Sequence, residues 1–413
     1  MSNWQDEAAR FTPSLNVLLL QGKDRARYFD RIGQSDIVLT TYALLPRDED
    51  ILMQHDFHLL ILDESQYIKN IRSKATQIAS SLKARHKLCL TGTPLENHLG
   101  ELWSQFHFLL PGLLGNEKTF NSEFRHSIER NGDEARQELL NRRIRPFLLR
   151  RTKDKVAREL PMKTEIVRYV ELTENQRQIY ESVRELMDKK VQDEIARLGI
   201  AHCQIIILEA LLKLRQVCCD PRLLRGSAYK KSTNASAKLA ELMEMLQELL
   251  LEKRHILVFS QFTSMLGLIE AELNTRNIPY ALLTGDTTDR ASAIRSFQEG
   301  QVSVFLISLK AGGVGLNLTA ADTVIHYDPW WNPAVENQAT DRAWRIGQDK
   351  PVFVYKLIAR GTLEEKIQDL QQRKAELAGA MLSTGQAQNV QITPEDLQSI
   401  FRPLAEQDMS SDE

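Results

Sequence analysis

The chain has 413 residues and a formal net charge of −2, with 42% hydrophobic and 26% charged residues. This balance excludes a globally basic nucleic-acid binder, but it is compatible with a basic groove whose charge is offset by acidic helices elsewhere. No apolar run is long enough to span a membrane, and the first residues carry no signal-peptide pattern. The length predicts two or three domains, and four cysteines without zinc-ligand spacing favour a reduced cytoplasmic setting.

The first region predicts a parallel sheet. Its apolar runs are continuous rather than alternating, and a helical pattern at 73–82 lies between the last two. Such strands, alternating with helices, are typical of parallel sheets that are covered on both faces and bind ligands at the carboxyl ends of their strands. The four predicted strands lie at 15–20, 36–41, 57–62 and 87–90.

Polar clusters follow the third and fourth of these strands, DESQ at 63–66 and TGTPLEN at 91–97. Of two adjacent acids, one can hold a magnesium ion, directly or through its water, and the next can orient and deprotonate an attacking water. An isolated acid pair also occurs as a helix N-cap. The hydroxyls of the second cluster either bridge phosphate chemistry to a moving loop or cap a helix that begins near Leu95.

Together, DESQ and LTGTPLEN resemble motifs II and III of the Swi/Snf group of superfamily-two helicase-like ATPases. The resemblance implies that Asp63 organises Mg²⁺, that Glu64 activates the hydrolytic water, and that Thr93 lies on the nucleotide side. The stretch DIVLTTY at 36–42 resembles motif Ib, where Thr40 and Thr41 would meet DNA backbone phosphate. The opening NWQDEAARF resembles the end of motif Ia, and we expect a bacterial member of the group.

One motif of the group does not occur in this sequence. The phosphate-binding loop of motif I has the form GxGKT, and no G-x-x-x-x-G-K-[ST] is found here. In the family this loop lies upstream of the point where the chain begins, so we expect an N-terminal truncation before motif Ia and an incomplete first lobe. Because the loop's lysine neutralises β- and γ-phosphate charge, we expect little ATP turnover by this chain alone.

The middle of the chain is predicted to be helical and locally basic, with helical patterns at 101–114, 121–141 and 173–214. The stretch 142–158 (RRIRPFLLRRTKDKVAR) is either a solvated hinge or a contact to the phosphate backbone, which needs charge but no sequence code. It resembles the segment leaving lobe one of the family, which favours DNA contact through Arg150 and Arg151. Further on, LRQVCCDPRLL resembles the stretch before lobe two, and Cys218 and Cys219 are expected to be small buried residues.

A second parallel α/β sheet is predicted after a small polar linker at 225–237. Its helices are expected at 236–251 and 289–297, and its strands at 255–259, 279–283, 302–307, 323–327 and 352–358.

A helix after the fourth of these strands is expected to carry Gln338, Arg342 and Arg345. At positions i, i+4 and i+7 these residues would share one helix face. Two fixed cations beside a glycine-rich backbone loop suit a polyphosphate, although a solvated helix face has the same pattern.

VFSQF, ISLKAGGVGLNL and QATDRAWRIGQ resemble motifs IV, V and VI of the family, and HYDPWWNP resembles its insertion before motif VI. The resemblance covers roughly residues 2–369. It implies that Arg342 and Arg345 are arginine fingers at the γ-phosphate, worth about three to five orders of magnitude in rate. Gln338 would hold the nucleotide end of the same helix.

Motif V and the aromatic insertion imply further contacts. Gly315 would allow close backbone approach and Asn317 would lie on the nucleotide side, whereas Ser308 and Lys310 would face the DNA backbone. Trp330 and Trp331 can be interpreted as base-stacking platforms. We favour packing between the lobes, because tracking along a duplex needs no unstacked bases.

The C-terminal region is expected to contain a helix at 364–381, a linker at 383–389 and a short helix that begins near Pro394. Residues 407–413 are expected to be disordered. The short helix should present one apolar face to lobe two, formed by Leu397, Ile400, Phe401 and Leu404.

The resulting hypothesis is an α/β protein of two RecA-like lobes with parallel sheets, the first lobe incomplete, and helical insertions between them. The expected division is a partial lobe one at 1–155, a helical insertion and linker at 156–235, lobe two at 236–382 and a tail at 383–413. The function implied by the resemblance is an ATP- and Mg²⁺-dependent translocase on the backbone of double-stranded DNA. Nucleoprotein or RNA polymerase are further candidate partners, with a nucleoid location in a bacterium and no membrane.

Two alternatives remain. The chain could be a non-hydrolysing DNA-binding fragment, or could pair with a separately encoded N-terminal fragment that carries GxGKT. It could also be a strand-separating helicase or an RNA helicase of the same superfamily. DESQ in place of DEAD or DExH, together with DPWWNP, argues against the second alternative.

Overall fold

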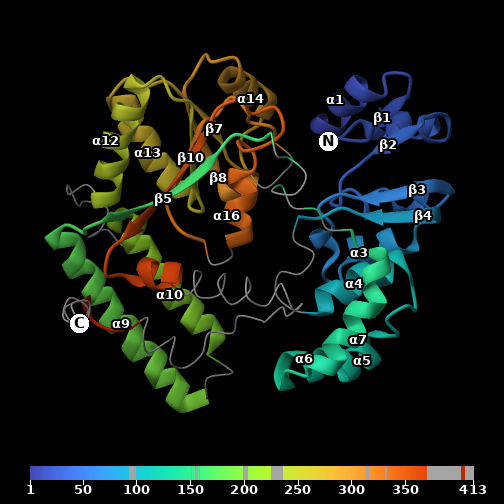
Figure 1. The fold of residues 1–413 in the computed structure, drawn as a ribbon, viewed down its shortest axis with the longest axis horizontal. Helices are drawn as coiled ribbons and strands as arrows, with labels where there is room; N and C mark the ends of the chain where they lie inside the picture. The colour runs from blue at the N-terminus through green and yellow to red at the C-terminus, as the bar shows by residue number, and fades with distance from the viewer. Residues whose placement is uncertain are drawn as a thin grey trace. The chain divides into compact units, whose positions relative to one another are not determined.

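The computed structural model describes residues 1–92, 99–149, 151, 153, 157, 159–198, 203–224, 236–312, 316–330, 333–369 and 401–404. These residues form two compact units, the first ending at Arg150 and the second beginning at Arg151 (Figure 1). Within this part of the chain, no helix is both long and apolar enough to cross a membrane.

Two pairs of parallel strands form the sheets of the first unit. β1 (Val17–Leu19) pairs with β2 (Ile37–Leu39), and β3 (Phe57–Leu62) pairs with β4 (Ala84–Cys89). The four strands lie where the apolar runs predict them, and their parallel pairing confirms that part of the prediction. β4 begins three residues earlier than its apolar run, because the register with β3 extends back to Ala84.

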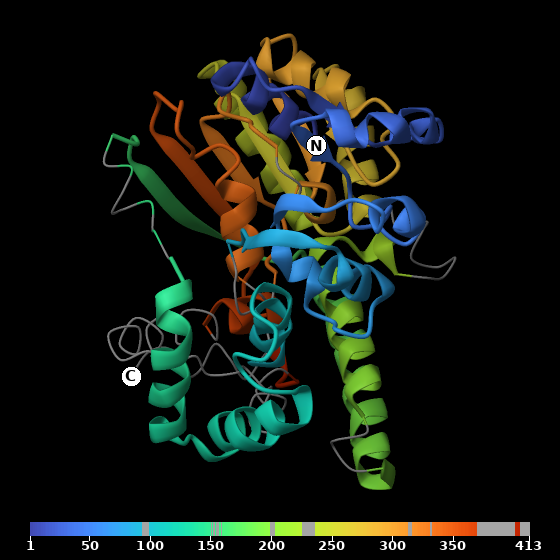
Figure 2. The same ribbon diagram turned by 90° about the vertical axis from the view of Figure 1, so that its right-hand side faces the viewer.

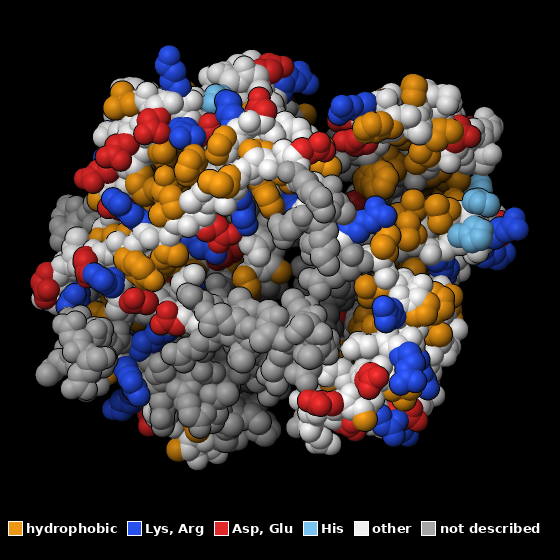
Figure 3. Space-filling view, viewed as in Figure 1, with side chains coloured by type: hydrophobic (Ala, Val, Ile, Leu, Met, Phe, Trp, Pro, Cys, Tyr) orange, Lys and Arg blue, Asp and Glu red, His pale blue; other side chains and the backbone are white. Residues whose placement is uncertain are grey.

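The expectation that this sheet is covered on both faces is wrong for β3 and β4. One face packs on a core that includes Leu62, Ile78 and Phe108. Side chains alternate across a strand, so the neighbouring positions point the other way. There the exposed fractions of Leu59, Ile61 and Leu88 are 45%, 39% and 42%, and hydrophobic side chains gather at the surface over these strands (Figure 3).

Short helices surround these strands, and a helical bundle follows them. Gly132, at φ +62°, ends one helix of the bundle, and Asp133 caps the next by accepting the N–H of Arg136, so the stretch predicted as one helix at 121–141 is divided. The helices of the unit are α1 (Ser2–Phe11), η1 (Arg25–Gln34), α2 (Glu49–Leu52), η2 (Ser65–Ile68), α3 (Lys74–Ser81), α4 (Leu99–Leu109), α5 (Glu117–Phe120), η3 (Asn121–Arg125), α6 (His126–Asn131), α7 (Glu134–Ile144) and η4 (Arg145–Phe147).

The second unit contains a six-stranded parallel sheet in the order β5-β10-β9-β6-β8-β7. Five of its strands were predicted, whereas β5 lies in the segment expected to be helical. As the edge strand it is partly exposed along most of its length, so it lacks the continuous apolar run of a central strand. The strands are β5 (Lys163–Val170), β6 (Ile256–Ser260), β7 (Tyr280–Leu283), β8 (Val304–Ser308), β9 (Thr323–His326) and β10 (Val352–Ala359).

Helices cover both faces of this sheet. One core packs α12 and α13 against alternate residues of the central strands, and a second packs α14, α15 and α16 against the residues between them. Both views show α9 and α10 extending beyond the sheet (Figures 1 and 2). The helices are α9 (Glu174–Leu198), α10 (Gln204–Cys219), η6 (Pro221–Leu223), α12 (Ala237–Leu251), α13 (Thr263–Thr275), α14 (Arg290–Gln298), α15 (Leu309–Gly312) and α16 (Pro333–Thr340).

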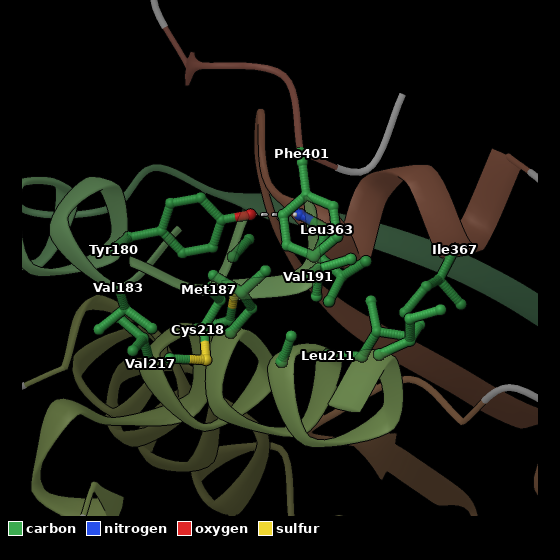
Figure 4. Close-up of a cluster of buried hydrophobic side chains, with 14 of the residues drawn as sticks. Tyr180, Val183, Met187, Val191, Leu211, Val217, Cys218, Leu363, Ile367 and Phe401 are labelled. Carbon is green, nitrogen blue, oxygen red and sulfur yellow. Dashed lines mark hydrogen bonds between the residues drawn. The ribbon is translucent and has the colours of Figure 1, made fainter. Parts of the chain in front are cut away.

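The C-terminal residues 401–404 pack on α9 and α10, in the segment expected to be a helical insertion, as well as in the same core as Leu363 and Ile367 of the predicted lobe two. Phe401 and Leu404 are buried in the core between α9 and α10 (Figure 4), and Arg184 donates to the Phe401 carbonyl at 2.9 Å. Cys218 and Cys219 are buried and reduced, which confirms their predicted role, and burial raises the pKa of both thiols. Residues 363–369 are helical, which confirms the start of the helix predicted at 364–381. The rest of that helix, Leu397, Ile400 and the other predicted C-terminal elements lie outside the described residues.

A fully buried ion pair joins α12 to the helical residues that follow β10. Lys238 Nζ lies 2.8 Å from Glu364 Oε2, and both side chains are 0% exposed. The same carboxylate oxygen accepts the N–H of Ala359 at 2.9 Å. The two charges depend on each other, because neither has water to solvate it.

Replacing Lys238 with Met should lower the free energy of unfolding by about 3–5 kcal/mol, because Glu364 would remain as an uncompensated buried charge. The double variant K238M/E364Q should recover part of this loss. Urea unfolding followed by circular dichroism measures both changes. Lys190→Met, which removes an exposed ion pair to Glu209, is the control and should have a much smaller effect; equal losses for the two lysines would contradict the assignment.

Candidate nucleotide and DNA sites

The acid cluster follows β3 directly, in a constrained turn. Glu64 has φ +50°, a left-handed conformation that is uncommon for residues other than glycine. It immediately precedes η2, but its side chain does not cap that helix. Instead, Glu64 Oε2 accepts a hydrogen bond from Gln66 Nε2 at 2.8 Å. The N-cap interpretation therefore does not explain Glu64.

A hydrogen-bonded chain links this acid to the second polar cluster. Thr91 Oγ1 donates to Gln66 Oε1 at 3.0 Å, and the Gln66 amide in turn donates to Glu64. The parallel register of β3 and β4 brings the two clusters together at the carboxyl ends of adjacent strands. Sequence reasoning did not single out Gln66, and its position two residues after Glu64 was the available signal. Thr93 lies outside the described residues.

Asp63 fits the role of a single magnesium ligand. Its side chain is exposed, Oδ1 accepts the N–H of Glu64 at 3.0 Å, and Oδ2 accepts the indole N–H of Trp4 at 2.8 Å. A carboxylate has about four acceptor directions, so both oxygens retain capacity for a cation. Among the described residues no three His, Cys, Asp or Glu side chains gather as a metal site. Phosphate sites hold Mg²⁺ through one or two carboxylates, the phosphates and water, so the chemistry of the exposed Asp63 carboxylate fits that ion.

The end of β2 is connected to the same acids. The Tyr42 hydroxyl donates to the Asp63 carbonyl at 2.8 Å, and burial raises the pKa of that hydroxyl. Of the two preceding threonines, Thr41 is exposed, whereas the Thr40 hydroxyl is buried and has no hydrogen-bond partner within the described residues. A phosphate bound at Thr41 would therefore lie one residue from the tyrosine that fixes the acid turn.

In the second unit, the arginines occupy a turn and not a helix face. α16 ends at Thr340, so the expectation that one helix carries Gln338, Arg342 and Arg345 is wrong. After Thr340 some backbone hydrogen bonds span fewer residues than in an α-helix. The N–H of Arg342 donates to the carbonyl of Ala339, three residues earlier, and the N–H of Arg345 donates to the carbonyl of Ala343, two residues earlier. Arg342 is 8% exposed, whereas Arg345 and Gln338 are half-buried.

Gln348 fixes the arginine turn, which we define as residues 341–345. Its amide nitrogen donates to the carbonyls of Ala321, Ala343 and Thr319 at 2.7, 3.1 and 3.1 Å. The Arg342 carbonyl also accepts the N–H of Leu318 at 2.9 Å. The turn is thus bonded to the loop that follows the glycine-rich stretch.

The aromatic insertion before α16 is held by buried polar groups. Arg215 donates to the Pro329 carbonyl, and its guanidinium lies 5.5 Å from the centre of the Trp330 ring. The N–H of Trp330 donates to Glu336 at 2.7 Å, and Asp328 accepts the Ser260 hydroxyl at 2.6 Å. These contacts give Trp330 a packing role within the second unit. Trp331 lies outside the described residues.

The predicted motif V contacts differ in exposure. Ser308 is buried, and its hydroxyl accepts the N–H of Ala311 at 3.3 Å at the start of α15. Lys310 and Asn317 are exposed, and the Asn317 carbonyl accepts Gln298 Nε2 at 2.9 Å. Gly315 lies outside the described residues. Of the two residues predicted to face the DNA backbone, the exposed Lys310 is better placed to contact a phosphate than the buried Ser308.

The basic stretch between the units exposes its cations. Arg142, Arg145 and Arg151 are exposed, while Arg150 lies outside the described residues. Leu149 beside them is 79% exposed. Exposed arginines suit phosphate oxygens, which they can contact without reading base sequence. Of the three, Arg142 also lies 3.8 Å from the Glu138 carboxylate.

Comparison with known proteins gives two matching families. Residues 1–223 match the SNF2-related domain, and residues 237–347 match the helicase conserved C-terminal domain. The chain is 38% identical to the putative ATP-dependent helicase/translocase YwqA of Bacillus subtilis, over 97% of this chain and 44% of that protein. It is 39% identical to an ATP-dependent helicase of Mycoplasma genitalium, over 91% of this chain and 36% of that protein.

Among solved structures, the SWI2/SNF2 ATPase core of Sulfolobus solfataricus in complex with dsDNA is 36% identical. The match covers 97% of this chain and 84% of that one, with a TM-score of 0.48. The chain spans less than half the length of the two bacterial relatives.

Replacing Arg151 or Lys310 with Ala should weaken duplex binding to a similar extent for every DNA sequence, because phosphate contacts carry no sequence code. Each lost contact should also reduce the slope of log affinity against log salt concentration by about 0.9. Fluorescence anisotropy at several salt concentrations measures both quantities. Lys190→Ala, an exposed lysine on α9, is the matched control. A salt slope that both variants leave unchanged would remove these residues from the interface.

Proposed function

The chain belongs to the SNF2 family, and on that basis we propose that it is the motor part of an ATP-dependent translocase on double-stranded DNA. The observation that carries the proposal is the chain of hydrogen bonds from Thr91 through Gln66 to Glu64, beside the exposed carboxylate of Asp63. An oriented carboxylate next to a candidate magnesium ligand is the arrangement that phosphoryl transfer to water requires.

The proposed roles of the acids follow from their contacts. Asp63 would hold magnesium, which when bound offsets the negative charge of the phosphates. Glu64 would orient the attacking water and take its proton, and Gln66 and Thr91 would keep the carboxylate of Glu64 in one position. A base held in this way loses less entropy when it aligns with the water. Thr93 would contact the nucleotide from the loop that follows Thr91.

The arginine turn would supply positive charge to the transferred phosphoryl group. Arg342 is almost fully buried, and a fixed cation in a low-dielectric setting stabilises developing charge more strongly than a solvated one. Arg345 is the more accessible of the two. Gln338, Gly315 and Asn317 would complete the nucleotide contacts.

DNA would be held through its backbone. We assign phosphate contact to Thr40 and Thr41 in the first unit, and to exposed cations of the connecting segment and the second unit. Backbone contact suits movement along a duplex, because it is the same at every step. The remaining proposed contacts are Lys310, Arg150 and Arg151, and Ser308 would join them only if its buried hydroxyl became exposed. Nucleoprotein or RNA polymerase would be the object that such a motor displaces.

A second candidate function is that of a complementing fragment, and the exposed face of β3 and β4 favours it. Parallel strands are ordinarily covered on both faces, but Leu59, Ile61 and Leu88 are exposed here. The 413-residue sequence also contains no GxGKT loop. Under this second proposal, a polypeptide that carries the loop would also cover this face.

ATP hydrolysis by the purified chain separates these two functions. With linear duplex DNA present, we expect little phosphate release from the chain alone and a large increase when a GxGKT-bearing segment is added or fused. Ile61→Glu should abolish the increase, because the new charge would lie in the covered face, whereas Tyr28→Glu, at an exposed position on η1, should not. Robust hydrolysis by the chain alone would contradict the complementation hypothesis.

In the form that hydrolyses ATP, Glu64→Gln and Arg345→Ala should each abolish turnover while duplex affinity stays within about twofold. Glu64→Gln keeps the shape and removes the base, and Arg345→Ala removes a cation worth about three to five orders of magnitude in rate. Steady-state hydrolysis and anisotropy on the same samples measure the two properties. If Arg345→Ala retains the parent rate, the arginine-finger assignment is wrong.

A further inference from the structure

Lys153 joins the start of the second unit to the arginine turn. Its ammonium nitrogen lies 2.6 Å from Asp341 Oδ1 and donates to the Trp344 carbonyl at 2.5 Å. It also lies 4.9 Å from the centre of the Trp344 ring. One lysine therefore contacts a carboxylate, a carbonyl and an aromatic face of the same turn, which together use the donors of an ammonium group.

A second contact fixes the other end of the same segment. The indole N–H of Trp344 donates to the Pro161 carbonyl at 2.8 Å, and the Lys163 ammonium lies 5.3 Å from the Trp344 ring. Residues 153 and 161 are thus both tied to the turn that carries Arg342 and Arg345. The chain that leaves the first unit enters the second unit at this turn.

The charges around Lys153 indicate what its contact with Asp341 does for Arg345. Burial lowers the pKa of Lys153, Asp341 opposes that shift, and the nearby positive charge of Arg345 adds to it. Asp341 and Arg345 therefore both lie close enough to Lys153 to influence its charge, and Asp341 is the one that it contacts, at 2.6 Å. If Lys153 were removed, the Asp341 carboxylate would be drawn to Arg345, four residues further along the same turn.

We propose that Lys153 is a positioning residue, which couples DNA contact on the connecting segment to the geometry of Arg342 and Arg345. Arg151, an exposed candidate for phosphate contact, is two residues away from it along the chain. A phosphate held by Arg151 acts on the same short stretch of backbone that Lys153 attaches to the turn. This inference rests on the proposed DNA binding, but it does not require that the chain hydrolyse ATP.

Hydrogen–deuterium exchange of residues 340–348, with and without duplex DNA, tests the coupling. In the parent chain, duplex should slow exchange in this stretch. Lys153→Met, which keeps most of the side chain that lies against Trp344, should eliminate the DNA-induced change, and Lys153→Arg should restore it. Adding Asp341→Asn to Lys153→Met should restore part of it, because the carboxylate that would capture Arg345 is then neutral. Lys190→Met is the matched control and should behave as the parent.

If Lys153 only stabilised the arginine turn, the exchange measurements would give a different result. In that case Lys153→Met would speed exchange equally with and without DNA, and the DNA-induced difference would persist. That outcome overturns the proposal, as does a parent chain whose turn does not respond to bound duplex. Duplex affinity, measured on the same samples by anisotropy, tests the proposed DNA binding separately.

Discussion

The parallel direction of the strands is the constraint on which both candidate sites depend. Since every strand of a sheet runs the same way, the loops that follow them gather at one edge. In the first unit, pairing of β3 with β4 places Glu64 and Thr91 within reach of the same Gln66 side chain. In the second unit, the order β10-β9-β6-β8 brings the glycine-rich loop after β8 and the aromatic insertion after β9 to the same edge. A one-residue slip of either register would turn these side chains to opposite faces.

Buried polar contacts then fix the chain segments that the sheet alone leaves undetermined. Gln348, Arg215 and Lys153 each bind main-chain carbonyls around the arginine turn or the aromatic insertion. Because the acceptor is a main-chain carbonyl, such a contact does not depend on which side chain the accepting residue has. The contacts of Gln348 and Arg215 are expensive to break, because each would leave a buried polar group without a partner. These contacts hold the backbone of the arginine turn in one conformation although the turn is not helical.

Much of this fold could be predicted from the sequence, and the exceptions have physical reasons. The central strands β6, β8 and β9 are apolar throughout, so their positions were evident. β5 escaped prediction because an edge strand alternates like a surface segment, and only its pairing with β10 identifies it. The arginine turn was predicted as helix because its spacing fits 3.6 residues per turn, while the bonds that end α16 at Thr340 come from distant residues. The acids after β3 were recognised, but the link through Gln66 required the register between two strands.

The central proposal is that the chain moves along double-stranded DNA and is not a strand-separating helicase. Displacement of a third strand from a triplex, by the chain supplied with a GxGKT-bearing segment and ATP, tests that claim most directly. The account predicts that ATP releases the third strand, that Glu64→Gln prevents its release, and that the two duplex strands stay paired. Release of a duplex strand, or a third strand that stays bound while ATP is being hydrolysed, would contradict it.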